Sequence, residues 1–544
     1  MLAAVRSAPV EHGGLEVAGP TSTLSARVAQ AAPSASSSWT QSEWLTPTTT
    51  LAAVASGTSQ YFRPSSASSY GQLVGTFGVC AGAGPWCQGP GDSAPGQTLR
   101  LAGNHKSDAA NPYSSDLNGD GISELLFANY YNGSTTVFNG GWIYWGQGTP
   151  TSPSWSTSQR TDLPTNGTWG MAVHDLNGDG FPEVLFSSYG AGDYVYWGQS
   201  GGTYGVWYSA VHRSELPVGG TYGLAVADLN HDGRPEIMNG NGISWGQAGG
   251  AYGLRYSAAA RTTLSLGMVI AVADLNSDGW PELVANGNGN FRIYWGQAGG
   301  VYGVDYSNSA STVLPTPSQE NYAIAVADLN GDGLPEVIQA NCCGPGVNFD
   351  SYIYWAQAGG TYGVSYTTSN RTALPTTAAY NLSVVDLNGD GQRDVVVQNC
   401  CASPLFVRVF WGPFPASGTA TNSWTFSHGY PGNFYGMSLS DLDSDGRVDL
   451  LISRYASDGA GGRVYFHNGN HSAPYSVAPS STLRVDFATA YVSFGPGRGT
   501  TTSLFGQPRA TYGAGLPAYG VLESMAIDSG QAGTVWQSVS TTAA

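Results

Sequence analysis

A nine-residue acidic segment recurs seven times in this chain and limits what it can fold into more than any other feature. One copy reads Asp328-Leu-Asn-Gly-Asp-Gly-Leu-Pro-Glu336. Successive copies start 59, 53, 46, 54, 58 and 55 residues apart, at Asp116, Asp175, Asp228, Asp274, Asp328, Asp386 and Asp441. A repeat of nearly constant period forms one structural unit per copy, so the repeats, and not the total length of 544 residues, set the architecture.

Each period contains the same short apolar segments in the same order. Gly223–Ala227 shows the first segment, which leads into the acidic loop, and Glu183–Phe186 shows the second, which leaves it. The third carries Ile-Tyr-Trp-Gly-Gln, as at Ile143–Gln147. A Gly-Gly-x-Tyr-Gly turn follows, and the fourth segment ends in Arg-Thr-x-Leu-Pro, as at Arg371–Pro375. Four short strands per period are typical of propeller blades. The sequence therefore predicts an all-β fold with a seven-bladed β-propeller of four-stranded antiparallel blades over residues 95–489.

The acidic segments have the composition of a cation-binding loop. Positions 1, 3, 5 and 9 carry oxygen-bearing side chains, and the glycine at position 6 permits a tight turn. Carboxylate and amide oxygens are the ligands that Ca2+ prefers. We expect about seven calcium ions, one per blade. An EF-hand is excluded because its loop has twelve residues and lies between helices.

The charge of the chain is concentrated in these loops. The formal net charge is -17, and 22 of the 37 acidic residues belong to the seven segments. No basic patch indicates a nucleic-acid partner. No segment approaches the roughly 20 apolar residues that a membrane-spanning helix needs. The acidity is thus an indication of local metal sites more than of an acidic surface.

The flanks of the repeat region divide into three segments. Residues 1–38 are rich in Ala, Ser, Pro and Gly, which predicts a flexible leader. Residues 39–94 contain short apolar runs and predict an N-terminal β and loop segment. Residues 490–544 predict a C-terminal β segment, for which packing against 39–94 is one arrangement. The segment 481–494 either completes blade seven or begins a degenerate eighth unit; we expect seven blades, closed by bringing both ends of the chain to one blade.

Six cysteines indicate an oxidising compartment. Cys80 and Cys87 bracket a Gly- and Pro-rich loop and are expected to form a local disulfide. Cys342 and Cys400 take equivalent places in consecutive periods, so they could be bridged to each other, or each could pair with its neighbour, Cys343 or Cys401. Disulfides and calcium sites together predict an extracellular or cell-surface protein, although no export signal is evident.

The seven copies in register resemble the FG-GAP and VCBS repeats of calcium-binding propellers, a family that includes the propellers of integrin α-subunits. The resemblance covers about residues 98–485. It implies one calcium per loop, held by the side chains of positions 1, 3, 5 and 9 and by the backbone carbonyl of position 7. Loop seven has an additional acid, Asp443, and is expected to bind most tightly. The implied ligands are Asp116, Asn118, Asp120, Ile122 and Glu124; Asp175, Asn177, Asp179, Phe181 and Glu183; Asp228, Asn230, Asp232, Arg234 and Glu236; Asp274, Asn276, Asp278, Trp280 and Glu282; Asp328, Asn330, Asp332, Leu334 and Glu336; Asp386, Asn388, Asp390, Gln392 and Asp394; Asp441, Asp443, Asp445, Arg447 and Asp449.

Aromatic residues recur at two other places in the period. The tryptophan of the third segment, as in Trp145, recurs so regularly that packing between blades is the expected role. Other aromatics fall where the channel mouth opposite the acidic loops is expected, and aromatic faces beside amides suit sugar rings. Packing between blades is the alternative for these residues too. The candidate ligand-binding residues are Trp169, Tyr222, Tyr322, Tyr380, Tyr435, Tyr130 and Tyr189.

Three functions are compatible with these features. The first is a secreted or surface adhesion and recognition module for glycans or extracellular proteins. The second is a structural subunit of an extracellular filament or surface layer, which would assemble with itself. The third is a polysaccharide-cleaving enzyme, but the eight histidines are scattered and no catalytic spacing is evident, so we expect no enzymatic activity.

Overall fold

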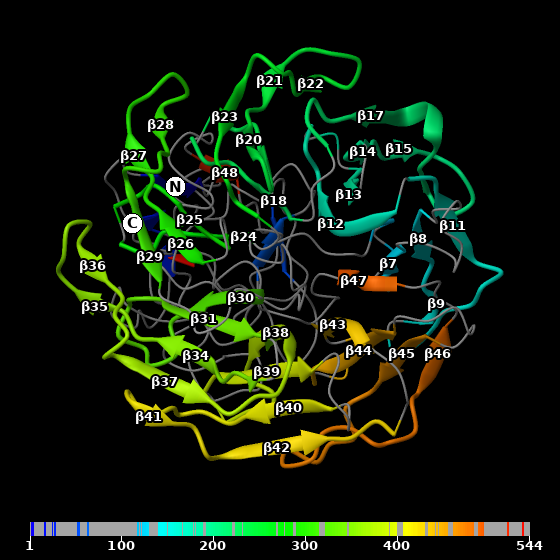
Figure 1. Ribbon diagram of the computed structural model, residues 1–544. Coiled ribbons are helices and arrows are strands. Elements are labelled where there is room, and N and C mark those ends of the chain that lie inside the picture. Colours follow the sequence, from blue (N-terminus) through cyan, green and yellow to red (C-terminus); the bar gives the residue numbers. More distant parts are fainter. Residues whose placement is uncertain are drawn as a thin grey trace.

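A computed structural model gives the fold of the chain, a ring of small sheets around a central axis (Figure 1). The structure describes most of residues 117–483 and the strands outside this range. Within 117–483 it leaves out residues 119, 121, 130–139, 150, 166, 178, 180, 189–191, 220–222, 231, 268–269, 277, 287–289, 315–320, 345–346, 391, 400–405, 430–433, 441, 444, 446 and 455–460.

Seven antiparallel sheets of four strands form the blades, as the sequence predicts. We number the blades one to seven. From the innermost strand outward they are β47 (Ala488–Ser493), β7 (Leu125–Asn129), β8 (Gly141–Tyr144) and β11 (Arg160–Leu163); β12 (Thr168–His174), β13 (Glu183–Ser188), β14 (Tyr194–Tyr196) and β17 (Arg213–Glu215); β18 (Leu224–Ala227), β19 (Glu236–Asn239), β20 (Gly242–Ser244) and β23 (Arg261–Thr263); β24 (Ile270–Ala273), β25 (Glu282–Ala285), β26 (Phe291–Tyr294) and β29 (Ser311–Leu314); β30 (Asn321–Ala327), β31 (Glu336–Asn341), β34 (Ser351–Tyr354) and β37 (Arg371–Leu374); β38 (Ala379–Val385), β39 (Asp394–Asn399), β40 (Val407–Phe410) and β42 (Ser423–Phe426); and β43 (Phe434–Ser440), β44 (Asp449–Arg454), β45 (Gly462–Tyr465) and β46 (Ser481–Leu483).

The innermost strands use small residues because space is least near the axis. β18 and β24 alternate alanine with a larger aliphatic residue, and all their side chains are buried. Successive side chains of a strand point to opposite faces, so both faces of these strands pack against neighbouring blades. The core of the propeller therefore lies between the sheets.

The ring is closed by pairing the two ends of the repeat region in blade one. β46 completes blade seven, and β47 then pairs antiparallel with β7, with Val492 opposite Phe127. The strand that follows blade seven in the chain thus supplies the innermost strand of the first blade. No eighth blade forms among the described residues. Because β47 pairs with β7, closure does not leave β7 as an unpaired edge strand in blade one.

The Gly-Gly-x-Tyr-Gly turns of blades two to five are short two-stranded hairpins outside the four-stranded sheets, and blade one has a hairpin without this motif at the same place. Each hairpin connects the third and fourth strands of a blade. In blade six, β41 (Gly418–Thr419) instead pairs with the outer strand β37 of blade five. The hairpins are β9 (Gln147–Thr149) with β10 (Ser152–Ser154); β15 (Gln199–Ser200) with β16 (Val206–Trp207); β21 (Gln247–Ala248) with β22 (Leu254–Arg255); β27 (Gln297–Ala298) with β28 (Val304–Asp305); and β35 (Gln357–Ala358) with β36 (Val364–Ser365).

Each hairpin tyrosine stacks on the third-strand tryptophan of the preceding blade. Trp245 and Tyr302 have ring centroids 4.5 Å apart and planes 15° from parallel. The indole Nε1 of Trp245 donates to Thr262 on the fourth strand of its own blade, which explains the recurring Arg-Thr pair. The packing role expected for the tryptophans is confirmed. The other stacked pairs are Trp145 with Tyr204, Trp197 with Tyr252, and Trp295 with Tyr362, at 4.5 to 4.6 Å.

Short strand pairs from the flanking segments form separate two-stranded sheets, and their presence does not test the predicted boundaries at 38, 94 and 490. Within the described part of the chain, no helix is long and apolar enough to cross a membrane. The outer pairs are β1 (Leu2–Ala4) with β48 (Tyr519–Val521), β2 (Glu16–Val17) with β3 (Leu24–Ser25), β4 (Arg27–Val28) with β49 (Trp536–Gln537), and β5 (Ala52–Val54) with β6 (Phe62–Pro64).

The tyrosine–tryptophan stack predicts a measurable coupling between blades. We expect Tyr302→Ala to lower the free energy of unfolding by about 2 kcal/mol, because it removes the ring that covers Trp245. Val301→Ala is the matched control: Val301 is the adjacent residue and 92% exposed, so its change should stay within about 0.5 kcal/mol. Urea denaturation measures both. Equal stability of the two variants would contradict the stack as an inter-blade contact.

A buried histidine predicts acid sensitivity. His428 is 2% exposed, and burial, with the nearby Arg463, lowers its pKa to about 4. Its pKa when unfolded is about 6.5, so the folded state binds fewer protons and loses stability as the pH falls below that value. Between pH 7 and pH 5 this residue should cost about 2 kcal/mol. Denaturation at both pH values should show a smaller drop for His428→Gln than for the unchanged protein; equal drops would contradict the assignment.

Candidate metal loops

The seven acidic segments lie on one face of the propeller. In blades two to seven each segment connects the first strand to the second; Asp175, for example, follows β12, and Glu183 is the first residue of β13. In blade one the segment leads into the second strand, β7, while the first strand, β47, comes from residues 488–493, and the common topology of the blades places all seven loops on one face. The β-hairpins connect third to fourth strands and lie at the same end, whereas connections between second and third strands lie at the opposite end.

The side chains of positions 1, 3 and 5 turn inward and fold the loop around themselves. In loop five, the two carboxylate oxygens of Asp328 accept hydrogen bonds from the backbone N–H groups of Gly331 and Gly333, at 2.7 and 2.8 Å. Asn330 Oδ1 accepts from Asp332 N at 2.8 Å, and Asn330 Nδ2 donates to Asp332 Oδ2 at 2.9 Å. Glycine at position 6 has a positive φ of 87° in this loop, which explains its recurrence.

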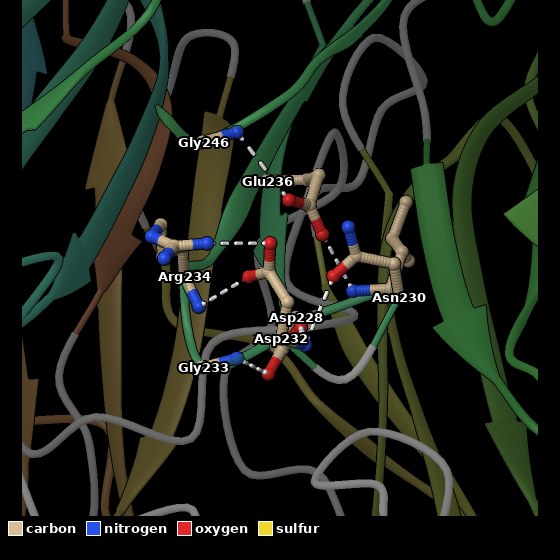
Figure 2. Close-up of polar contacts among 8 residues, drawn as sticks. Asp228, Asn230, Asp232, Gly233, Arg234, Glu236 and Gly246 are labelled. Atoms are coloured by element: carbon tan, nitrogen blue, oxygen red, sulfur yellow. Dashed lines mark hydrogen bonds and ion pairs between the residues drawn. The ribbon is translucent and has the colours of Figure 1, made fainter. Parts of the chain in front are cut away.

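In loops three and seven, an arginine at position 7 pairs with the fifth-position aspartate. Figure 2 shows Arg234 beside Asp232, with Arg234 Nη1 2.8 Å from Asp232 Oδ2. Arg447 lies 2.6 Å from Asp445 in the same way. Both pairs are partly exposed, so they contribute little to stability. In loop seven, the arginine offsets the charge that Asp443 adds, and the tighter binding expected there stays a prediction.

The acid at position 9 makes a different set of contacts. In every loop, one of its oxygens accepts a hydrogen bond from the backbone N–H of position 2, at 2.6 to 2.9 Å. In Figure 2, the other oxygen of Glu236 faces Gly246 N at the end of the third strand, 3.3 Å away. In the last two blades this second contact shortens to 2.9 Å, from Gly412 to Asp394 and from His467 to Asp449. The ninth residue therefore ties the loop to the third strand.

These ninth-position carboxyl groups are fully buried, which makes their negative charge costly. Burial raises the pKa of Glu336 to about 9. Burial and, secondly, the first-position aspartate Asp228 raise the pKa of Glu236 well above its usual value. The same two causes, in the same order, act on Glu183 and Glu282. A bound cation would relieve this repulsion, because carboxylates next to a divalent ion keep their charge.

The residue types of the loop suit calcium, since two carboxylates, an amide oxygen and the backbone carbonyl of position 7 are all hard oxygen ligands. Among the described residues, no three Asp, Glu, His or Cys side chains converge closely enough to hold an ion by themselves. In loop three, both oxygens of the ninth residue, Glu236, are directed at backbone N–H groups. The first-position residues Asp116 and Asp441 lie outside the described residues.

The β-hairpin of the next blade packs against the loop. A methyl group placed on Gly303 of blade four would come within 3.9 Å of the Asn230 side chain in loop three. Gly363 of blade five lies at the same distance from Asn276 in loop four. The Gly-Gly-x-Tyr-Gly hairpin thus contacts both the tryptophan and the acidic loop of the preceding blade. Sequence spacing did not indicate this contact, and the recurring glycine after the tyrosine reflects its positive φ.

The two described candidates of the ligand-binding aromatics pack on each other. Tyr322 and Tyr380 are stacked with centroids 4.5 Å apart. Tyr380 is 5% exposed and Tyr322 is partly buried, and both belong to a packed cluster that includes Met171 of blade two. This pair makes the packing contacts expected for the alternative, and its ligand-binding role stays a prediction. Tyr130, Tyr189 and Tyr222, and the side chains of Trp169 and Tyr435, lie outside the described residues.

The predicted disulfides are not tested by the structure. Cys342 is buried in the cluster that contains Tyr380. Cys80, Cys87, Cys400 and Cys401, and the side chain of Cys343, lie outside the described residues.

Comparisons with known proteins identify the repeat and similar folds. A family model for an FG-GAP-like repeat matches residues 116–186, 175–238 and 274–338. No curated protein matches the chain. A lectin of Agrocybe aegerita that recognises non-reducing terminal N-acetylglucosamine is 16% identical, with 68% of this chain and 92% of the lectin covered and a TM-score of 0.40. The V. cholerae biofilm matrix protein Bap1 is 12% identical, with 73% and 84% covered and a TM-score of 0.35. A Lactobacillus plantarum protein is 12% identical, with 68% and 97% covered and a TM-score of 0.42.

The position-9 contacts predict a cost that does not depend on metal. In excess chelator, Glu336→Ala should lower the free energy of unfolding by about 3 kcal/mol, because it leaves the buried Leu329 N–H without an acceptor. Glu336→Gln keeps one acceptor oxygen and should cost less. Asp332→Ala is the control, since its hydrogen bonds are exposed, and should cost under about 1 kcal/mol. Similar losses for Glu336→Ala and Asp332→Ala in urea denaturation would contradict the distinction.

Proposed function

Because this chain is an FG-GAP-repeat β-propeller, we propose that it is a calcium-stabilised recognition module that binds glycans or extracellular proteins and acts outside the cell. The observation that carries the proposal is a difference between the two faces of the ring. One face repeats the same nine-residue loop in every blade. The opposite face has connections whose length varies among the blades, from two to eleven residues.

The connections between second and third strands show this variation. In blade three, only residues 240–241 separate β19 from β20. In blade five, residues 342–350 separate β31 from β34 and include a small hairpin, β32 (Cys343–Gly344) with β33 (Val347–Asn348). Blade one uses residues 130–140. Connections that are free to vary on a rigid scaffold are where binding residues are usually placed, because the scaffold holds them without depending on their sequence.

Calcium has a structural part in this proposal. The residues that would hold it are those of positions 1, 3 and 5 and the position-7 carbonyl, together with the nearby ninth-position charge. A divalent ion would compensate the negative charge of these buried and half-buried carboxylates. Because the hairpin of the next blade rests on the loop, an ion there would also strengthen the contact between blades.

Removal of calcium is expected to weaken the fold. An ion that binds only the folded state stabilises it by about 4 kcal/mol per site at a thousandfold excess over its dissociation constant. The melting temperature should therefore fall by several degrees in excess chelator and recover when calcium is restored. Asp332→Ala should reduce the response to calcium while changing the melting temperature in chelator only slightly. A melting curve that is the same with and without chelator would refute the metal assignment.

Recognition by the opposite face is tested by an exchange between blades. Replacing residues 343–349 of blade five with Gly-Asn-Gly keeps the buried Cys342 and gives a connection of five residues, the length that blades two and four have, so the melting temperature should stay within a few degrees. Binding to an array of glycans and extracellular matrix proteins should fall at least tenfold. Val301→Ser, at an exposed hairpin tip on the other face, is the control and should bind as the unchanged protein does. Undiminished binding by a folded exchange variant would count against this face.

A further inference from the structure

Blade two departs from the repeat at two positions of its outer region. In the β-hairpins, Trp207 pairs with Gln199, and the residues that take the same register in the next three blades are Arg255, Asp305 and Ser365. The carbonyl that accepts a hydrogen bond from the third-strand tryptophan belongs to His212 in blade two, and to Ala260 and Ala310 in the next two. An aromatic residue and a histidine therefore replace polar or small residues together, in one blade.

Trp207 is exposed, whereas the third-strand tryptophan of the same blade is buried. Its exposed fraction is 43%, whereas Trp197 in the same blade is 1% exposed. Val211, in the short 3-10 turn η5 (Ala210–His212), is 78% exposed. The neighbouring hairpin residues Ser200, Gly201 and Thr203 are also exposed and are small or polar. The flat apolar indole of Trp207 is thus exposed on a hairpin whose other exposed residues are small or polar.

Neighbouring rings hold Trp207 in place. The His212 imidazole meets it edge to face, with centroids 4.8 Å apart and planes at 74°. His212 Nδ1 lies 3.5 Å from the hydroxyl of Tyr252, which belongs to the hairpin of blade three. Tyr252 is stacked on Trp197 at 4.6 Å and is therefore fixed. The three side chains form a preorganised group across the border of blades two and three, with an exposed indole and two polar ring groups beside it.

We propose that Trp207, His212 and Tyr252 form a binding site for one pyranose ring of a glycan. The C–H face of a pyranose packs on an aromatic ring, while its hydroxyls need hydrogen-bonding groups at the edge. The indole supplies the first requirement, and the imidazole and the phenol supply the second. A second protein is a poorer match, because a stable interface buries about 800 Å2 on each partner and this group has a single large apolar side chain.

The site lies on the face of the acidic loops, so it is separate from the recognition surface proposed above. It rests on the proposed function only for the class of ligand. The two proposals can therefore fail independently.

The repeat itself supplies the variants for the test. Trp207→Arg introduces the residue that blade three has at this position, and His212→Ala introduces the alanine of blades three and four, so both should fold with an unchanged melting temperature. Titration of the calcium-loaded protein with methyl pyranosides, followed by tryptophan fluorescence and confirmed on a glycan array, should show saturable binding. We expect Trp207→Arg to weaken it at least tenfold and His212→Ala severalfold.

A transfer variant gives a second readout. Arg255→Trp combined with Ala260→His places the same pair on blade three, beside Tyr302 of blade four, and should raise the number of bound pyranosides from one to two. Arg255→Trp alone lacks the imidazole and should bind as the unchanged protein does.

Several outcomes would overturn the site. Unchanged pyranoside affinity in folded Trp207→Arg would do so, even if the blade-five exchange abolishes binding and supports the opposite face. Loss of concentration-dependent self-association in Trp207→Arg, with no pyranoside response in the unchanged protein, would assign the group to contact with a second copy instead.

Discussion

The fold depends on one buried hydrogen-bonded carboxyl group per blade. The ninth residue of each acidic loop accepts a hydrogen bond from the loop backbone, and its second oxygen faces the end of the third strand. The acidic loop, the second strand that carries the ninth residue and the end of the third strand thus meet at one buried side chain. Removing this side chain would leave the buried backbone N–H groups that it accepts from without an acceptor. Glutamate and aspartate both serve, because Glu336 and Asp394 reach the same backbone positions.

Contacts between blades build on this arrangement. A blade fixed by its ninth-position acid presents a tryptophan at a constant place, and the next blade covers it with a hairpin tyrosine. The glycine after that tyrosine has a positive φ, 91° at Gly303, and lies beside the acidic loop. Loop, tryptophan and hairpin therefore form one contact that repeats around the ring. In the proposed calcium-bound state, an ion would act both within a blade and between blades.

Because of this repeated contact, the sequence and length of the connections can vary more on one face of the propeller than on the other. The acidic face is constrained, since each loop and hairpin supports its neighbour. The opposite face is not, and its connections range from two residues in blade three to eleven in blade one. Trp207 and His212 are exceptions on the constrained face, because they change positions where the repeat tolerates different side chains. Residues that differ from the repeat in a single blade can be recognised only because the other blades are regular. Such residues can add a binding site without changing the packing of the ring.

The sequence by itself determined the repeat number, the four strands per blade and the place of the acidic loops, because these depend on local patterns such as Glu183–Phe186 and the Asp-x-Asn-x-Asp-Gly turn. It also determined the packing role of the recurring tryptophans. Only the tertiary structure decided that β47 completes blade one, that Tyr322 and Tyr380 stack on each other, and that the ninth-position acids face backbone N–H groups. These are contacts between residues far apart in the chain. The geometry of these contacts follows from how the sheets pack around the central axis, and the spacing of residues along the sequence does not predict it.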